Sequence, residues 1–576
     1  MGPAGVTLRW SAPKGSKPAI YQVLRNGRVL ARTTHRSFTD TTVKPGSAYR
    51  YAVRGLDKHG RRGFVSNRVR VTVPKVVARP LPAPGASAGP TPSIAPIAQG
   101  PPAPAPPPLT AAMVDRLFWR AGFGPSPAHR SAWIGRPHAE LVDWLLDTPP
   151  TLLPTSTPPL TAAGAPIDPL VSDDELIMEW LDRMQRSDNP LPERLAFFWH
   201  RHWAVSRDDG LPAQWMITYR DRMRRFADLP GNPNLSFRAI AYEMTTADGA
   251  MSAFLNGSSN VKGSPNENYA REFMELFCLG PKGPDGSDNY VQADVAGLAR
   301  ALTGWRLDGT DTSPTYGQVF FTPSRFEPGA KTFLGQTIAA VPTPAKDADG
   351  PACVNRAVDV VLAHRNHAQF LIRKLWAEFI ASPIPQATLD ALVAQYTAGG
   401  RFALRPVLRG ILTDPLIFES IDEPNLVKPP IVYVVGLLRQ VGAPLKGSYM
   451  SVALANMQQR PYHPPNVAGW EGGLSWFNSN TVQGRFDAVV RVQYLKYSNY
   501  YAGGTAPVPP DIVGETVQGV FDRAYAAANS PWLAAGTRAA LLSYAATLPA
   551  ATPAQRRQRF YTLQALILGG PDGQVM

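Results

Sequence analysis

Two patterns of hydrophobic and polar residues follow one another along the chain. Within the first 75 residues, apolar and polar positions alternate in Val6–Trp10, Tyr21–Arg25, Tyr49–Val53 and Val69–Val73. Alternation with a period of two predicts half-buried β-strands, and several short strands at such spacing are typical of a β-sandwich. We therefore expect a small all-β module over residues 1–76.

After Leu109, apolar residues recur at helical spacing, as in Leu141–Leu146, Leu176–Leu181 and Phe370–Trp376. This recurrence predicts amphipathic helices, and strand-like alternation is scarce in this part of the chain. We expect a mainly α fold, a large multi-helical domain over residues 109–576 with long loops in which sites are often built. The long loops are expected at residues 147–170, 280–290, 306–350 and 460–480.

Between the two regions, residues 77–108 are a Pro- and Ala-rich linker. Twelve prolines lie between Pro80 and Pro108, and this stretch contains no Lys, Asp or Glu. Such a composition predicts an extended spacer. A β module on a Pro-rich spacer is common in secreted enzymes and serves adhesins equally well.

The net charge of +14 belongs to the β module. Of the 58 Lys and Arg residues, 16 lie in residues 1–75 with only two of the 44 acidic residues, so the rest of the chain carries 42 of each. A strongly basic module favours an anionic partner. We expect residues 1–76 to bind an anionic cell-surface or extracellular polysaccharide, whereas the neutral helical domain gives no reason to expect nucleic acid.

Several functional classes are disfavoured by what the sequence lacks. No apolar run reaches the roughly 20 residues of a membrane span, so no transmembrane segment is expected. There is no Gly-x-Gly-x-x-Gly and no Gly-Lys-Ser/Thr, which argues against a nucleotide cofactor. The single Gly-x-Ser-x-Gly match, Gly85–Gly89, falls inside the linker, where the strained turn of a serine hydrolase cannot form. We expect no cofactor.

Two cysteines are too few for a disulfide framework or a Cys-based zinc site. For Cys278, a buried thiol on a helix is favoured over a bridge to Cys353. The chain begins without the charged and apolar segments of a signal peptide, and its first strand looks shortened. We therefore expect an extracellular or periplasmic protein whose signal peptide lies upstream of this sequence.

The densest group of candidate catalytic residues lies on a helix predicted to begin near Asn266. At 100° per residue, Glu267, Asn268, Arg271, Glu272 and Glu275 share one face and apolar residues fill the other. The simplest interpretation is a capped surface helix with ion pairs at i,i+4. The functional interpretation is a pair of carboxylates, Glu272 and Glu275, with separated pKa values, as glycoside cleavage requires.

Two pairs of histidines are candidate metal ligands. His200 and His202 are two residues apart on a predicted helix and point about 200° apart, which argues against a shared ion, although His202 can face a pocket as an acid or base. His364 and His367, at i,i+3, have no acidic partner nearby and are expected at the surface. We predict no metal site.

The loop Tyr462–Asn478 carries aromatic residues beside amides and a carboxylate. Trp470 and Trp476 suit the apolar face of a sugar ring, and His463 and Asn466 suit its hydroxyl groups. The alternative is that both tryptophans pack in the helical core.

Six blocks of the helical region resemble one bacterial family, known only as domain of unknown function 1800. The resemblance covers about residues 109–576 and implies a helical domain, an export route and frequent pairing with an exported sulfatase- or phosphatase-like partner. Where the family usually shows His-Asp before the Gly-x-Lys-Thr block, this chain has Phe326-Glu327. The matching blocks are Arg120–Pro125, Pro265–Glu272, Ala299–Trp305, Lys331–Gly335, Lys428–Pro430 and Pro464–Trp470.

The first module is similar to a fibronectin type III domain. The resemblance rests on Trp10 in an early strand, on Val43–Tyr49, which looks like that fold's tyrosine corner, and on Ser66-Asn67 before the last strand.

These observations predict an exported carbohydrate-active hydrolase or related enzyme that acts on a polysaccharide or glycoconjugate through a Glu/Arg cluster. The alternatives are a non-enzymatic surface or assembly protein that binds the sulfatase-like partner or an anionic matrix and, more weakly, a metal-dependent enzyme. The predicted catalytic residues are Glu267, Arg271, Glu272, Glu275 and His202, and the predicted substrate contacts are Asn268, Trp305, Lys331, His463, Asn466, Trp470 and Trp476.

Overall fold

The chain divides into two compact units, Met1–Ala103 and Pro104–Met576. The linker predicted over residues 77–108 lies outside the described residues except for its last two, so the three-part division remains a prediction. The computed structural model describes residues 6–10, 20–25, 28–34, 37–40, 42–43, 48–56, 62–65, 69–72, 107–155, 158–497 and 509–576.

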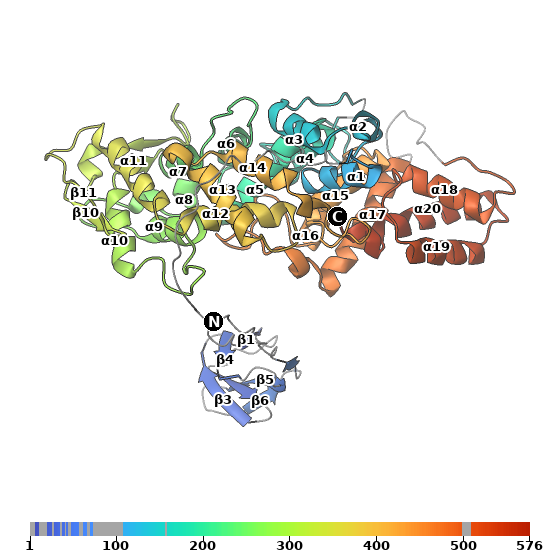
Figure 1. Ribbon diagram of the computed structural model, residues 1–576, viewed down its shortest axis with the longest axis horizontal. Coiled ribbons are helices and arrows are strands. Elements are labelled where there is room, and N and C mark those ends of the chain that lie inside the picture. The colour runs from blue at the N-terminus through green and yellow to red at the C-terminus, as the bar shows by residue number, and fades with distance from the viewer. Residues whose placement is uncertain are drawn as a thin grey trace, which may run out of the picture. The chain divides into compact units, whose positions relative to one another are not determined.

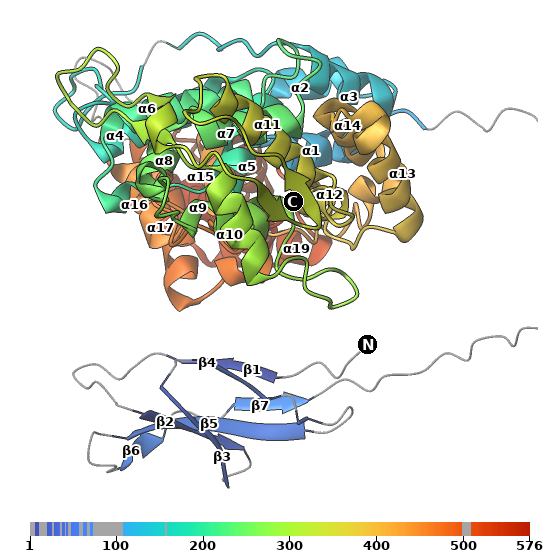
Figure 2. The ribbon, with the colours of Figure 1, turned by 90° about the vertical axis from the view of Figure 1, so that its left-hand side faces the viewer.

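The first unit is an antiparallel β region (Figure 2), with strands at all four places where the alternation predicts them. β1 pairs with β4, and a second sheet has the order β3-β2-β5-β6, with β7 also on β5. Parts of the fibronectin-like features, residues 44–47 and Ser66-Asn67, lie outside the described residues. The strands are β1 Val6–Arg9, β2 Ile20–Arg25, β3 Arg28–Thr33, β4 Ser37–Asp40, β5 Ala48–Leu56, β6 Arg62–Val65 and β7 Val69–Thr72.

Asp40, one of the two acidic residues of this basic unit, is buried. Its Oδ2 accepts hydrogen bonds from the Tyr51 hydroxyl at 2.6 Å and from Arg25 Nη1 at 2.7 Å. Burial opposes ionisation, but the hydrogen bonds from Tyr51, Thr42 and Arg25 outweigh it and lower the pKa of Asp40 to about 2. The negative charge of Asp40 is therefore paired inside the unit and neutralises little of the positive charge on its surface.

The second unit is helical, as the spacing of apolar residues predicts (Figure 1). Its α-helices are α1 Ala111–Arg120, α2 Pro127–Trp133, α3 His138–Asp147, α4 Asp173–Arg186, α5 Leu191–His202, α6 Ala213–Arg225, α7 Phe237–Thr246, α8 Gly249–Phe254, α9 Asn268–Glu272, α10 Gln292–Ala301, α11 Asp349–Leu362, α12 His367–Phe379, α13 Gln386–Thr397, α14 Leu404–Thr413, α15 Pro430–Val441, α16 Tyr449–Asn456, α17 Ser479–Tyr497, α18 Val517–Ala527, α19 Ala535–Thr547 and α20 Pro553–Gly569.

Shorter elements complete the unit. The long loop predicted at 306–350 contains two small antiparallel hairpins, β8–β9 and β10–β11. Their strands are β8 Trp305–Leu307, β9 Val319–Phe321, β10 Lys331–Phe333 and β11 Gln336–Ile338. The 3₁₀ turns are η1 Arg207–Asp209, η2 Gly257–Ser259, η4 Pro323–Arg325, η5 Ala398–Gly400, η6 Pro415–Phe418, η7 Gly473–Trp476 and η8 Pro571–Gln574, and η3 Phe273–Cys278 is a π-helix.

Two helices, α5 and α15, form the centre of the hydrophobic core. Nearly every residue of α5 is buried, and so is every residue of α15 from Pro430 to Leu438. In Figure 1, α10 and the hairpin β10–β11 lie at one end of this unit and α18–α20 at the other. Among the described residues, no helix combines the length and the hydropathy that crossing a membrane requires.

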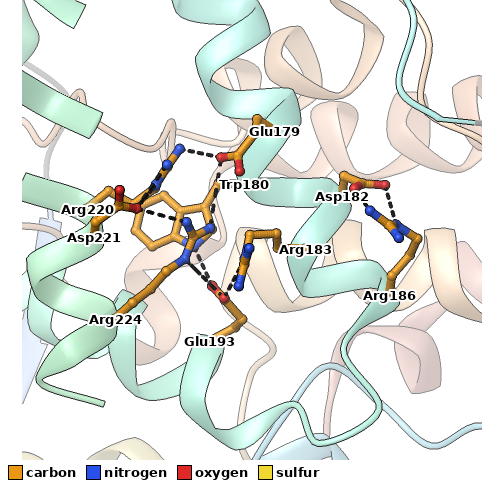
Figure 3. A network of polar contacts seen from close by, with 9 residues as sticks. All are labelled: Glu179, Trp180, Asp182, Arg183, Arg186, Glu193, Arg220, Asp221 and Arg224. Carbon is orange, nitrogen blue, oxygen red and sulfur yellow. Dashed lines mark hydrogen bonds and ion pairs between the residues drawn. The ribbon is translucent and has the colours of Figure 1, made fainter. Parts of the chain in front are cut away.

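A network of polar contacts fixes α5 against α4 and α6 (Figure 3). The buried carboxylate of Glu193 on α5 accepts hydrogen bonds from Trp180 Nε1 at 2.8 Å and from Arg224 Nε at 3.0 Å. Beside it, Arg220 on α6 pairs with Glu179 on α4. A buried charge is tolerated when it is paired and hydrogen-bonded. The network therefore sets the position from which α5 presents its two histidines.

Candidate functional site

The segment with the predicted carboxylates is a helix in two parts. The first part, α9, begins at Asn268, close to the predicted start. Its N-cap position is Glu267, whose side chain makes no capping hydrogen bond, whereas Asn266 Oδ1 accepts the Asn268 amide at 2.9 Å. The prediction of a regular α-helix is wrong from Phe273 onward, where the π-helix η3 replaces it. Wider π-turns are frequent at functional sites. Here the turn changes the direction of Glu275 from the one that α-helical spacing predicts.

Glu267 and Arg271 form a surface cluster with Gln292 of α10. Arg271 Nη2 lies 3.1 Å from Glu267 Oε2 and donates to Gln292 Oε1 at 2.8 Å, and Gln292 Nε2 donates to Glu267 Oε2 at 2.6 Å. Both charged side chains are about one third exposed, at 35% for Glu267 and 38% for Arg271. Asn268, which is half-buried, begins α9 beside them. Arg271 therefore pairs with Glu267 at the i,i+4 spacing seen in the sequence.

Glu272 and Glu275 occupy different environments. The Tyr290 hydroxyl donates to Glu275 Oε2 at 3.0 Å, whereas Glu272 has no hydrogen-bond partner among the described residues. Glu272 is half-buried, and burial together with the negative charge of Glu275 raises its pKa, against the opposing effect of Arg271. A carboxyl group with a raised pKa can donate a proton, and a hydrogen-bonded carboxylate can accept one.

The carbonyl groups at the end of η3 are held by side chains from two other helices. Lys374 Nζ of α12 donates to the Leu276 carbonyl at 3.1 Å, and His202 Nε2 of α5 lies 3.0 Å from the Phe277 carbonyl. His367 Nδ1 of α12 lies 2.9 Å from the Cys278 carbonyl. Because a carbonyl oxygen only accepts hydrogen bonds, His202 Nε2 and His367 Nδ1 each carry a proton and donate it. The expectation that His367 lies at the surface is wrong, since it is fully buried.

His200 and His202 face apart, as their spacing predicts. His200 Nε2 accepts the Tyr462 amide at 2.9 Å and its Nδ1 lies 2.9 Å from the Tyr219 hydroxyl, so both nitrogens are used in the core. Burial, assisted by His463, lowers the pKa of His200 to about 3. Burial, followed by the charge of Lys374, also lowers the pKa of His202 well below its usual value. His202 lines a cavity of about 330 Å³, and its Nδ1 has no hydrogen-bond partner among the described residues.

In the predicted sugar-binding loop, the polar residues contact protein groups. His463 Nδ1 lies 2.7 Å from Asp208 Oδ1, and its Nε2 lies 3.3 Å from Asp173 Oδ2. The exposed Asn466 accepts the Ala468 amide at 2.9 Å in a turn. These contacts fix the loop against η1 and the start of α4.

Both tryptophans of this loop are buried. Trp470 stacks on Phe197 of α5 with ring centres 5.7 Å apart. Trp476 lines a second cavity, of about 240 Å³, together with Arg194 and Glu378. The indoles therefore pack in the core, which was the alternative to sugar binding. Their contact with a sugar remains a prediction.

Lys331 and Trp305 lie on the small hairpins and are buried as well. Lys331 Nζ lies 4.3 Å from the ring centre of Phe326 and has no hydrogen-bond partner among the described residues. Burial lowers the pKa of Lys331. Trp305 packs against Phe321 with ring centres 5.5 Å apart. Phe326, which stands where the family usually has His, thus gives the Lys331 ammonium an aromatic face.

Three basic residues that the sequence did not single out line the cavity at His202. They are Arg201 of α5 and Arg373 and Lys374 of α12. One sequence feature could have indicated them: Arg373 and Lys374 are adjacent in the predicted helix Phe370–Trp376, which has no acidic residue. Spacing along the sequence does not reveal that this pair meets Arg201.

Among the described residues, the cysteines form no disulfide and the metal-ligating side chains form no cluster. Cys278 and Cys353 are both buried free thiols, which agrees with the expectation for Cys278. Among the residues that the structure describes, no three His, Cys, Asp or Glu side chains are grouped as a metal ion would need.

Comparison with known proteins gives one short match and one long match. A stretch of 68 residues is 38% identical to chitinase C of Streptomyces lividans and covers 12% of this chain and 11% of that protein. The chain therefore aligns with only about a tenth of chitinase C. No solved structure matches the chain. The family described as "Protein of unknown function (DUF1800)" matches residues 116–575, most of the helical unit. The chain therefore belongs to the DUF1800 family.

Proposed function

We propose that the helical unit is a carbohydrate-active hydrolase in which Glu272 and Glu275 do the chemistry. The observation that carries the proposal is the contrast between the two carboxyl groups. Glu272 is half-buried, with a raised pKa, and Glu275 is hydrogen-bonded to Tyr290 at 3.0 Å. The partial similarity to chitinase C, over 68 residues of the chain, supports a carbohydrate-related role for the protein as a whole.

In this proposal the protonated Glu272 gives its proton to the glycosidic oxygen as the bond to the anomeric carbon breaks. The Glu275 carboxylate takes a proton from the water that attacks the anomeric carbon. One water is consumed, and one reducing end and one free hydroxyl are formed. The Tyr290 hydroxyl orients Glu275, and the cluster of Glu267, Arg271 and Gln292 holds the start of the helix.

The test compares three single substitutions of similar size. Glu272→Gln and Glu275→Gln should each lower the release of reducing ends from a panel of chitin oligosaccharides, peptidoglycan strands and uronic-acid polysaccharides by about 100-fold or more. Glu423→Gln, at an exposed position elsewhere in the helical unit, is the matched control and should retain activity. All three should melt within a few degrees of the wild type, because the carboxylates are not in the core.

Two results would overturn the proposal. The first is a wild-type protein that releases no reducing ends from any member of the panel. The second is a Glu272→Gln, Glu275→Gln double variant as active as the Glu423→Gln control.

We propose a second function, binding to an anionic matrix, for residues 1–76. It is supported by their 16 basic and two acidic residues, of which Asp40 is buried and paired. Such a module would hold an exported enzyme near an anionic polysaccharide through long-range attraction that salt weakens.

A further inference from the structure

The cavity of about 330 Å³ between α5 and α12 has a strongly basic lining. Arg201 extends into it from α5, and Arg373 and Lys374 extend from consecutive positions of α12. Phe198 and Phe370 form apolar walls beside the three cations. Arg373 is exposed at the rim, and Lys374 is only partly exposed.

The acidic residues near this cavity do not balance its positive charge. The nearest carboxylate partner is Glu378, whose Oε1 lies 2.8 Å from Arg194 Nη2 and whose Oε2 lies 3.4 Å from Arg201 Nη1. The Arg194 side chain is 2% exposed, so Glu378 is needed there to compensate a buried charge. Among the described residues, neither Arg373 nor Lys374 has a carboxylate within ion-pair distance.

Apart from the ion pair of Arg201 with Glu378, the protein groups that contact these cations are neutral. Lys374 Nζ donates to the Leu276 carbonyl and lies 5.0 Å from the ring centre of Phe370. Arg201 Nε donates to the Trp470 carbonyl at 2.9 Å. Each contact positions a cation without cancelling its charge. Burial, followed by repulsion from Arg201, lowers the pKa of Lys374 to about 8, so these surroundings destabilise the ammonium.

We propose that this cavity binds the anionic group of a sugar residue, a sulfate or carboxylate, with Arg201, Arg373 and Lys374 as its ligands. Guanidinium groups match the geometry of such oxyanions, and an ammonium adds a point charge. The apolar walls of Phe198 and Phe370 suit the C–H face of a sugar ring that carries the anion. The site is independent of hydrolysis by Glu272 and Glu275.

The test measures binding of four probes to the full chain by isothermal titration calorimetry at constant ionic strength. The probes are inorganic sulfate, N-acetylglucosamine 6-sulfate, glucuronic acid and unmodified N-acetylglucosamine. We expect at least one of the two anionic sugars to bind more tightly than inorganic sulfate and the unmodified sugar not to bind. Affinity of both anionic sugars no higher than that of inorganic sulfate would overturn the sugar part of the proposal, and binding of none of the three anions would overturn it altogether.

Substitutions place the binding in this cavity. Arg373→Ala and Lys374→Met should each weaken binding of the tighter-binding anionic sugar about tenfold or more, as expected for a lost charge-assisted hydrogen bond. Arg401→Ala removes the same charge from another exposed arginine of the helical unit and should leave binding unchanged. Residues 1–76 are present in every variant, so any contribution of their basic charge to binding is the same in all of them. Equal affinity in Arg373→Ala, Lys374→Met and Arg401→Ala would show that the cavity is not the site.

The same titration with the Glu272→Gln, Glu275→Gln double variant separates the two proposals. It should bind the same anionic sugar as the wild type does even if neither protein cleaves any glycan. Loss of binding in this variant alone would contradict an independent site.

Discussion

Lys428 is the buried cation whose environment departs most from that of an ordinary lysine. It is 4% exposed, its Nζ donates to the Gly573 carbonyl at 2.9 Å, and it lies 3.8 Å from the ring centre of Trp119. Arg485 Nη2 donates to the Lys428 carbonyl at 2.8 Å. No carboxylate pairs with Lys428 among the described residues. Burial, followed by repulsion from Arg485, lowers its pKa to about 7.

From the lowered pKa of Lys428 we predict that the free energy of unfolding rises with pH in the alkaline range. An unfolded lysine titrates near pH 10.5, so between about pH 7 and 10 the unfolded chain binds a proton that the folded protein has lost. The contribution of Lys428 to the free energy of unfolding should increase by up to about 1.4 kcal/mol per pH unit in this window and stay flat below it. Urea unfolding of wild type and Lys428→Met at pH 6, 7, 8 and 9 measures the difference. A parallel pH dependence in the two proteins would contradict the prediction.

At the scale of elements, the end of the π-helix η3 depends on donors from α5 and α12. Replacing His202 or His367 by Phe keeps the bulk of the ring but leaves the Phe277 or Cys278 carbonyl without its partner. Each substitution should lower the free energy of unfolding by about 1–3 kcal/mol, the cost of a buried unsatisfied polar group. Urea unfolding should show a much smaller effect for His364→Ala, a half-buried histidine just before α12. Equal effects of all three substitutions would show that the carbonyl contacts contribute little.

The same elements show what sequence patterns could and could not predict. Apolar spacing correctly predicted a helix at α5 and the opposite directions of His200 and His202, because both follow from 3.6 residues per turn. It did not predict the π-turn after Glu272. The carbonyl groups of that turn are satisfied by Lys374 and His367, which lie about 100 residues further along the chain. Contacts between residues so far apart in the sequence produce no local pattern from which the π-turn could be predicted.

A second element-scale difference concerns polar residues inside α5. Its Glu193, Arg194 and His200 are all buried, although charged and polar residues of this kind usually lie at the surface. Each is paired with a residue from another helix, such as Glu378 for Arg194. Such pairing is visible only in three dimensions, which is why the basic cavity beside His202 could not be assembled from the sequence.

At the scale of the whole molecule, the described residues indicate where the helical unit begins. Leu109 is 1% exposed, and its backbone pairs with Arg136 and Gly135 at 2.9 and 2.8 Å. A chain starting at residue 107 should therefore melt like the full protein's helical unit. A chain starting at Thr110 keeps the cap of α1 but loses Leu109, and should be less stable by about 2–3 kcal/mol. Differential scanning calorimetry of the two truncations tests this, and equal melting temperatures would contradict it.

The distribution of charge predicts a second difference between the full chain and a chain starting at residue 107. Binding of the full chain to alginate-coated beads should fall as sodium chloride rises from 50 to 300 mM, because long-range attraction is screened. The truncated chain should lose most of that salt-sensitive binding while keeping its activity on soluble glycans. Any binding that remains should respond to Arg373→Ala. Alginate binding that is unaffected by the truncation would show that the charge of residues 1–76 is incidental.

The burial of α5 and α15 has a consequence for motion in the helical unit. Amide hydrogens of these helices should exchange with deuterium only when the whole unit unfolds, because opening either one exposes the centre of the core. The segment of α9 and η3 combines a half-exposed polar face with a buried apolar face at Phe273, Met274, Phe277 and Cys278, and three side chains anchor its end. Its amide hydrogens should therefore be protected as well, and the carboxylates should keep their positions while a bulky chain binds and leaves.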